Sequence, residues 1–247
     1  MAAWTIKPLC FGEFPVFEKS VFTYLRHFGE KVSAPILGWL LQNGPEAILV
    51  DTGPSSPEMA KGWHTAIQQS PAQRPGAAIR AAGADPAQLA KIVLTHLHWD
   101  HCYNLELFPA ARFWVQGDEV QTALNPLPTQ RLPYELGIPD RQPPWRAVFD
   151  RLHVIRGEFE IAPGVTLIPL PGHTPGLQGV LVDTGRGKYL IASDALPLNE
   201  NLSEGIPPGI HIDVAACFES LARMRQVADV VLPSHDPVAL QHAIYPE

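Results

Sequence analysis

A cluster of four potential metal ligands directly follows an apolar stretch near the middle of this 247-residue chain. The stretch, residues 91–94, has the character of a buried strand, and the cluster consists of His96, His98, Asp100 and His101. A loop at the end of a strand can place His96 and His98 on one side, and Asp100 and His101 on the other. Imidazole and carboxylate groups together suit zinc, manganese or ferrous iron. The pattern therefore predicts a metal site at a strand end.

Three further candidate ligands occur singly downstream, at His173, Asp194 and His235. Each follows an apolar run and precedes small or turn-forming residues, as expected where a sheet fixes the geometry of a metal site. Taken alone, each has a simpler interpretation. His173 could be a turn residue, Asp194 a helix N-cap and His235 a capping residue in a loop. Together with the first cluster they supply five histidines and two aspartates. This set is large enough for two metal ions that share a bridging carboxylate.

The candidate ligands occur in the same order along the chain as in the metallo-β-lactamase superfamily, which the chain resembles. The resemblance extends from about residue 6 to residue 242. Asp51, Thr52 and Gly53 follow another apolar run and match a strand-end motif of that superfamily. Within it, the chain is most similar to the N-acyl homoserine lactonases, on residues 22–31, 98–105, 200–202 and 206–210. The resemblance implies an α/β fold, a four-layer αββα sandwich of two packed mixed β-sheets flanked by helices. We expect one domain covering residues 1–247.

The resemblance also implies how the site works. It predicts two divalent ions, zinc or else manganese or iron. The first ion is expected to bind His96, His98 and His173, and the second Asp100, His101 and His235. Asp194 is expected to bridge the two. A hydroxide held between two such ions attacks a carbonyl or phosphoryl centre. Asp100 is the expected proton carrier, since one of its oxygens can reach that hydroxide. Trp99 either lines the substrate pocket, as the resemblance implies, or packs behind the loop.

The expected function is that of a metal-dependent hydrolase that opens a lactone or related cyclic ester. The alternatives are an iron-dependent oxidoreductase of the same fold and a hydrolase of another ester, a thioester or a phosphodiester. A non-catalytic metal-binding domain is disfavoured by the complete ligand set. We expect the substrate to be a small molecule.

One residue departs from the lactonase pattern. Lactonases of the similar group carry a tyrosine three residues after the bridging aspartate, and its hydroxyl hydrogen-bonds the lactone oxygens. Here that position is Pro197, whose side chain has no donor. Without a replacement, the protein should be a poor N-acyl homoserine lactonase. The candidate replacements are Ser193, Asn199, Tyr103 and Tyr134.

The composition of the chain bears on which molecules it binds and in which cellular compartment it works. The chain has 18 basic and 25 acidic residues, a net charge of −7, which argues against a nucleic-acid surface. No apolar run approaches the roughly 20 residues of a membrane span, and the first residues lack the pattern of a signal peptide. The three cysteines are far apart and are typical of reduced thiols, so we expect a cytoplasmic protein. We expect Cys102, next to His101, to pack rather than bind metal.

Strand and helix patterns alternate along the chain. The expected strands are 35–41, 46–50, 92–95, 112–116, 152–155, 165–169, 178–182, 188–191 and 230–232. The expected helices are 58–69, 77–83, 118–124, 212–227 and 238–243, the fourth with Ala215, Phe218, Leu221, Ala222 and Met224 on or near one face.

The stretch 125–144 contains six prolines, so neither a regular helix nor a central strand can run through it. We expect an excursion from the core that covers the site or builds a contact in a homodimer, with Tyr134 and Trp145 as contact residues. A plain surface loop is the alternative.

Overall fold

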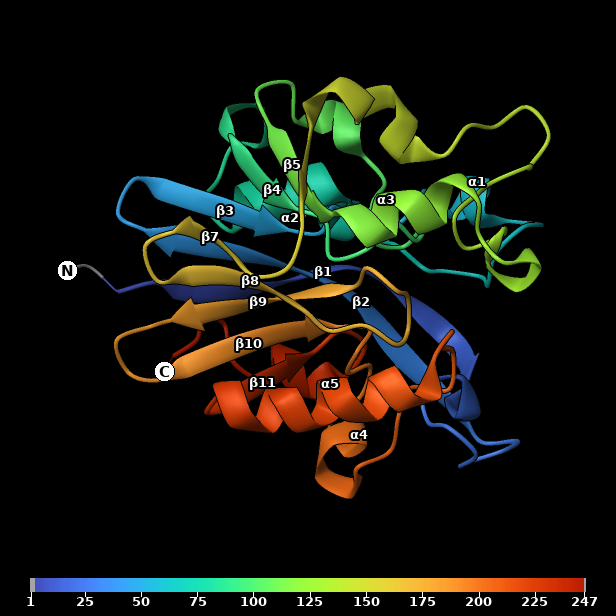
Figure 1. The fold of residues 1–247 in the computed structure, drawn as a ribbon. Coiled ribbons are helices and arrows are strands. Elements are labelled where there is room, and N and C mark those ends of the chain that lie inside the picture. Colours follow the sequence, from blue (N-terminus) through green and yellow to red (C-terminus); the bar gives the residue numbers. More distant parts are fainter. Residues whose placement is uncertain (1–2, 247) are drawn as a thin grey trace.

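Two β-sheets packed face to face form the centre of the computed structural model, which describes residues 3–246 (Figure 1). Sheet 1 has the strand order β1 (Thr5–Glu18), β2 (Lys31–Asn43), β3 (Glu46–Val50), β4 (Lys91–Val93), β5 (Arg112–Gln116) and β6 (Leu152–Ile155). Sheet 2 has the order β11 (Val230–Pro233), β10 (Lys188–Ser193), β9 (Gln178–Asp183), β8 (Val165–Pro169) and β7 (Phe159–Ala162). Strands β3 to β6 run parallel, as do β10 and β11, and the other pairs are antiparallel. Both sheets are therefore mixed.

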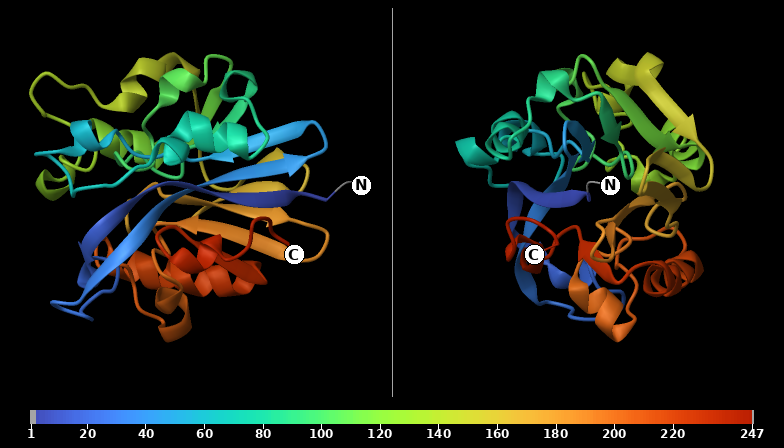
Figure 2. Two further views of the ribbon diagram at one scale, coloured as in Figure 1. Left: turned by 180° about the vertical axis from the view of Figure 1, so that it is seen from behind. Right: turned by 90° about the vertical axis from the view of Figure 1, so that its left-hand side faces the viewer.

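Helices cover the outer face of each sheet (Figures 1 and 2). On the side of sheet 1 lie α1 (Pro57–Ala60), α2 (Pro75–Ala81) and α3 (Gly117–Leu124), and on the side of sheet 2 lie α4 (Asn199–Glu204) and α5 (Val214–Val227). The layers run helix, sheet, sheet, helix, so the predicted four-layer sandwich is confirmed. Within residues 3–246, every helix is too short or too polar to cross a membrane.

Side-chain alternation along the strands divides the core into layers. In β3, Ile48 and Val50 belong to the cluster between the two sheets, whereas Leu49 belongs to the cluster under the helices of sheet 1. In β4, Val93 and Ile92 divide in the same way. The period of two thus lets one short strand contribute to two cores. The ends of β3 and β4 are therefore packed on both faces.

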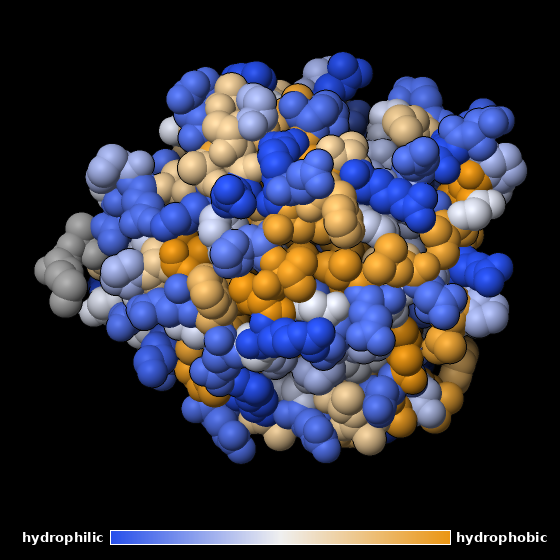
Figure 3. Space-filling model, turned by 45° about the horizontal axis from the view of Figure 1, so that its top comes forward, coloured by the Kyte–Doolittle hydropathy of each residue, from blue (hydrophilic) through white to orange (hydrophobic). Residues whose placement is uncertain are grey.

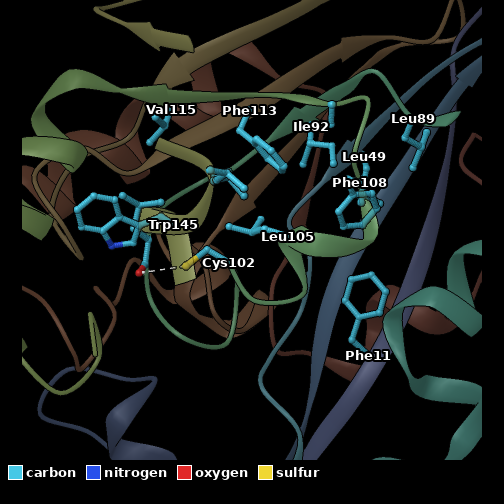
Figure 4. Packing of buried hydrophobic residues seen from close by; sticks show 14 of the residues in the cluster. Phe11, Leu49, Leu89, Ile92, Cys102, Leu105, Phe108, Phe113, Val115 and Trp145 are labelled. Carbon is cyan, nitrogen blue, oxygen red and sulfur yellow. Dashed lines mark hydrogen bonds between the residues drawn. The ribbon is translucent and has the colours of Figure 1, made fainter. Parts of the chain in front are cut away.

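Cys102 lies in the cluster under the helices of sheet 1 (Figure 4). Its thiol is fully buried and donates a hydrogen bond to the carbonyl oxygen of Leu97 at 3.3 Å. Within the described residues, Cys102 belongs to no group of side chains placed to hold a metal. The structure agrees with the packing role expected from the sequence.

The segment 58–69 is not the predicted helix. Helix α1 ends at Ala60, the chain turns over residues 61–64, and Gln68 then pairs with Glu13 of β1. The predicted helix at 238–243 is also wrong, because Pro237–Leu240 form a single 3-10 turn.

Strands β1 and β7 were not predicted from the sequence. In β1, the pairing with β2 shifts register between Cys10 and Gly12 and again between Phe14 and Phe17. Such irregularities bend a strand and interrupt its alternating pattern.

The proline-rich excursion packs against the core instead of standing away from it. Tyr134 and Trp145 are 0% and 1% exposed and join the same cluster as Cys102. They are therefore core residues, and their expected role as contact residues is wrong. The backbone N–H of Trp99 donates to the carbonyl of Pro133 at 2.9 Å, which ties the excursion to the ligand loop.

The surface also carries apolar side chains. On one face of the molecule, hydrophobic residues form a band bordered by hydrophilic ones (Figure 3). Large exposed apolar side chains occur at the turn between β1 and β2, where Leu25 and Phe28 lie, and in the excursion, where Leu127 and Leu132 lie. Both segments lie beside the pocket described below.

Replacing Tyr134 with alanine should test how tightly the excursion is packed. The buried ring leaves a cavity, so Tyr134→Ala should lower the free energy of unfolding by about 3–5 kcal/mol. Leu127→Ala, in the same excursion but 53% exposed, should change it by less than about 0.5 kcal/mol. Urea unfolding followed by circular dichroism measures both. Equally small losses would indicate a loosely attached loop.

Candidate metal centre and active site

Strand ends from both sheets bring the candidate ligands together. The cluster 96–101 follows β4 of sheet 1, His173 lies between β8 and β9, Asp194 directly follows β10, and His235 follows β11. Strands β10 and β11 are parallel, so the residues after their carboxyl ends lie side by side. The packing of the two sheets therefore assembles the site from segments far apart in the sequence.

All seven predicted ligands meet at this place. The described residues form three groups in which one potential ligand atom from each member lies within 4.8 Å of the others: His96, His98 and His173; His96, His101 and Asp194; and Asp100, His101 and His235. All are buried. The first and third groups have the same members as the two sets expected from the resemblance.

Asp194 lies between these groups and directs one carboxylate oxygen toward each. Its Oδ2 atom is 3.9 Å from Nε2 of His96 and 3.5 Å from Nε2 of His173. Its Oδ1 atom is 3.2 Å from Nε2 of both His101 and His235. One carboxylate is thus placed to contact two cations.

The buried nitrogens of this site fit metal ions. Nε2 of His96 is buried and has no hydrogen-bonding partner in the described structure. Leaving such an atom unsatisfied costs about 1–3 kcal/mol. Nδ1 of His98 and Nε2 of His173 converge to 3.1 Å. A divalent ion among these atoms would satisfy Nε2 of His96 and would take the place of the contact between the other two nitrogens.

The opposite ring nitrogen of three of these histidines is held by the protein, and such contacts orient metal-binding imidazoles. These contacts join Nδ1 of His101 to Asp51 at 2.8 Å, Nδ1 of His173 to the Ile210 carbonyl at 2.8 Å, and Nδ1 of His235 to the Pro35 carbonyl at 2.9 Å. A carbonyl oxygen only accepts, so Nδ1 of His173 and of His235 carries a proton. The lone pair on each Nε2 then faces the centre.

The charges of the site attract a cation. Burial lowers the pKa of His96 and His98 well below the ordinary value, with neighbouring imidazoles acting in the same direction. Burial would also lower the pKa of His101, but the carboxylates of Asp194 and Asp100 raise it well above the ordinary value. Burial would raise the pKa of Asp194, yet it lies well below its usual range, chiefly because of His101 and the neighbouring His235. Asp194 is therefore a carboxylate.

Two further buried carboxylates hold the ligand loops. Asp51 follows β3 and accepts hydrogen bonds from the backbone N–H and the hydroxyl of Thr95, both at 2.8 Å. Glu119 on α3 accepts from the N–H of Leu97 at 2.9 Å and the hydroxyl of Thr174 at 2.6 Å. Glu119 was not predicted from the sequence. A short helix that begins with two acids does not reveal which acid is buried.

A pocket of about 280 Å³ opens onto this centre. Its floor includes Asp194, and its walls are largely apolar. Trp99 lies on the wall and meets Phe14 edge to face, with ring centroids 6.2 Å apart. Phe14 and His64, which also line the pocket, were missed because they lie in segments remote from the ligands in sequence.

Pro197 lies on the pocket wall, and its carbonyl accepts a hydrogen bond from the backbone N–H of His235 at 2.9 Å. The four candidate replacements for the missing tyrosine do not belong to the described pocket lining. Three have other partners: the Ser193 hydroxyl contacts that of Thr95, Tyr103 donates to Glu135, and Tyr134 donates to Glu119. Asn199 is exposed. No replacement donor comes from these four.

Comparison with known proteins assigns the family. Residues 35–235 match the model of the metallo-beta-lactamase superfamily. The chain belongs to this superfamily. It is 28% identical over 225 residues to an N-acyl homoserine lactonase of a Bacillus species, covering 84% of each chain.

Two solved structures share the fold of this superfamily member. One is an N-acyl homoserine lactone hydrolase with the product N-hexanoyl-L-homoserine at its catalytic metal centre; its TM-score is 0.80 at 22% identity, over 100% of this chain and 99% of that one. The other is the dizinc quorum-quenching lactonase AidC, with a TM-score of 0.73 at 17% identity, over 99% of this chain and 90% of that one.

Removing the shared carboxylate should affect both halves of the centre. We expect about two divalent ions per chain in the parent protein, a marked loss from both positions in Asp194→Ala and a loss mainly from one position in His235→Ala. Elemental analysis of the purified proteins measures this. Asp85→Ala removes an exposed cap of the 3-10 turn before β4, at the end of that strand opposite the candidate ligands, and serves as the control. Equal metal content in all four proteins would contradict the bridging role.

Proposed function

We propose that this protein is a metal-dependent hydrolase that opens a lactone or related cyclic ester. The observation that carries the proposal is the position of Asp194, which lies between two groups of ligands at the floor of a largely apolar pocket. The superfamily match and the lactonase relatives support this reaction class.

In this proposal the centre holds two divalent ions. We assign His96, His98 and His173 to the first ion, and Asp100, His101 and His235 to the second. Asp194 bridges the two ions. The imidazole and carboxylate donors suit zinc, with manganese and iron as the alternatives. When bound, two such ions lower the pKa of water toward neutrality and polarise the carbonyl oxygen of the substrate.

The side chains of this protein supply binding and proton transfer. A water oxygen forms a bond to the lactone carbonyl carbon, the ring C–O bond breaks, and the ring oxygen leaves with a proton as a hydroxyl group. The product is a hydroxy acid, with one water consumed and no change of oxidation state. Asp100 lines the pocket and is our candidate to carry the proton. Trp99 and Phe14 provide an apolar wall that limits the entry of water.

A small molecule is the substrate that this pocket fits. Its volume of about 280 Å³ is close to the smallest pockets that hold drug-sized ligands. The net charge of −7 disfavours a nucleic acid. We also propose that the protein works in the cytoplasm, because Cys10, Cys102 and Cys217 are all free thiols.

Chelation should abolish the proposed activity and destabilise the fold. Because a metal ion binds the native state, its removal should lower the melting temperature, and adding zinc, manganese or iron should restore both properties. The measurement is a screen of lactones, thioesters, β-lactams and phosphodiesters before and after chelation, with scanning calorimetry. Full activity with one tightly held ion would contradict the two-metal assignment. Activity confined to non-lactone substrates would overturn the lactonase proposal.

Pro197 should limit the hydrolysis of N-acyl homoserine lactones. We expect kcat/KM below about 10⁴ M⁻¹s⁻¹ for these substrates, which is the low end for a dedicated enzyme. Pro197→Tyr should raise it, since a single well-placed donor is worth up to about 10²–10³ in rate. Pro197→Phe adds the ring without the hydroxyl and is the matched control. Equal effects of the two variants would show that ring packing, and not a hydrogen bond, determines activity.

A further inference from the structure

His64 is a fixed polar group on a largely apolar pocket wall. Its ring stacks on Trp99, with centroids 4.2 Å apart and planes 10° from parallel. Its Nε2 atom forms a hydrogen bond with Oε1 of Glu135 at 2.8 Å. The two side chains are 2% and 0% exposed. Stacking and hydrogen bonding therefore fix both the position and the rotation of the imidazole.

Glu135 determines which nitrogen of His64 carries the proton. Tyr103 donates its hydroxyl to Oε2 of Glu135, and Arg141 donates to Oε1 at 3.3 Å. Burial would raise the pKa of Glu135, but hydrogen bonds from His64 and Tyr103 outweigh burial and hold it below the ordinary value. Glu135 is thus a carboxylate and can only accept. Nε2 of His64 must therefore be the protonated nitrogen.

In the uncharged form of the imidazole, the other nitrogen, Nδ1, then keeps a lone pair. Among residues 3–246, no protein group is hydrogen-bonded to it. We propose that His64 is a substrate-binding residue whose Nδ1 accepts a hydrogen bond from an N–H or O–H group on the lactone side chain, so that the pocket prefers lactones carrying such a donor. This inference rests on the proposed lactonase function.

A purely structural role is the alternative for the same pair. His64 and Glu135 join the segment after α1 to the excursion, and that tie alone would explain their contact. It would not require an imidazole stacked on the pocket wall, because any donor could reach Glu135. The acceptor on His64 also differs from the donor that Pro197 lacks. His64 would choose among lactones by their side chain, without replacing the contact to the ring oxygens.

The test compares two lactones of the same shape. One is N-hexanoyl homoserine lactone, and the other is the analogue in which a CH₂ group replaces the amide N–H. The metal-loaded parent should favour the first by about three- to tenfold in kcat/KM, the effect of one hydrogen bond, and mainly through KM. His64→Phe preserves an aromatic ring for stacking on Trp99 and should bring the ratio close to one. His153→Phe alters an exposed histidine that packs near Trp114, outside the pocket lining, and should leave the ratio unchanged.

A second variant separates binding from folding. His64→Asn keeps a polar atom near the position of Nδ1 but cannot reach Glu135 as the imidazole does, so it should retain part of the preference even if the melting temperature falls. Equal kcat/KM for both lactones in the parent, or equal losses on both in His64→Phe, would overturn the inference and leave the lactonase proposal standing. Failure of the metal-loaded parent to open either lactone or any other would overturn both.

Discussion

The buried carboxylate of Asp51 holds together the part of the structure on which the centre depends. Parallel strands β3 and β4 end side by side, and Asp51 follows the first with a left-handed φ of 60°. It accepts hydrogen bonds from Thr95 after the second strand and contacts Nδ1 of His101. Burial raises the pKa of Asp51, and His101 and the hydrogen bonds from Thr95 oppose that rise by favouring the charged form. One side chain thereby connects two strand ends to a candidate ligand.

The candidate ligands could be picked out of the sequence because each stands in a local pattern, whereas the four-layer fold was predicted from the resemblance to a family. Each of His173, Asp194 and His235 follows an apolar run, and a layered fold brings strand ends together. The segment 58–69 could not be predicted, since the pairing of Gln68 with Glu13 is a distant contact that no local pattern reports. The prolines of the excursion correctly excluded regular elements. They carried no information about how deeply Tyr134 is buried.

In helix α5 the periodicity was right for Leu221 and Met224, which are buried, and wrong for Phe218. Hydrophobicity favours an inward Phe218, but this side chain is 51% exposed, and Cys217 and Ser220 are buried instead. The hydroxyl of Ser220 donates to the Pro171 carbonyl at 2.7 Å, in the loop that carries His173. In that loop a Cβ atom on Gly172 would lie 2.4 Å from the Cys217 sulfur. Small residues are required on α5 where the backbone of the His173 loop approaches the helix closely. A hydrophobicity pattern carries no information on such close approaches.

The ligands and the pocket walls come from different parts of the architecture. The ligands stand directly after strands, whereas the walls come from the far end of the β1–β2 hairpin, the segment after α1, the excursion and the loop after α4. The long β1–β2 hairpin extends past the rest of the sheet toward α4 (Figure 1). There the side-chain amide of Asn201 on α4 donates a hydrogen bond to the Phe22 carbonyl at 2.8 Å. Loops tolerate insertion and exchange far better than strands do. Lineages that share this centre can therefore diverge in substrate by exchanging one peripheral loop at a time, while the hydrolytic chemistry is inherited unchanged.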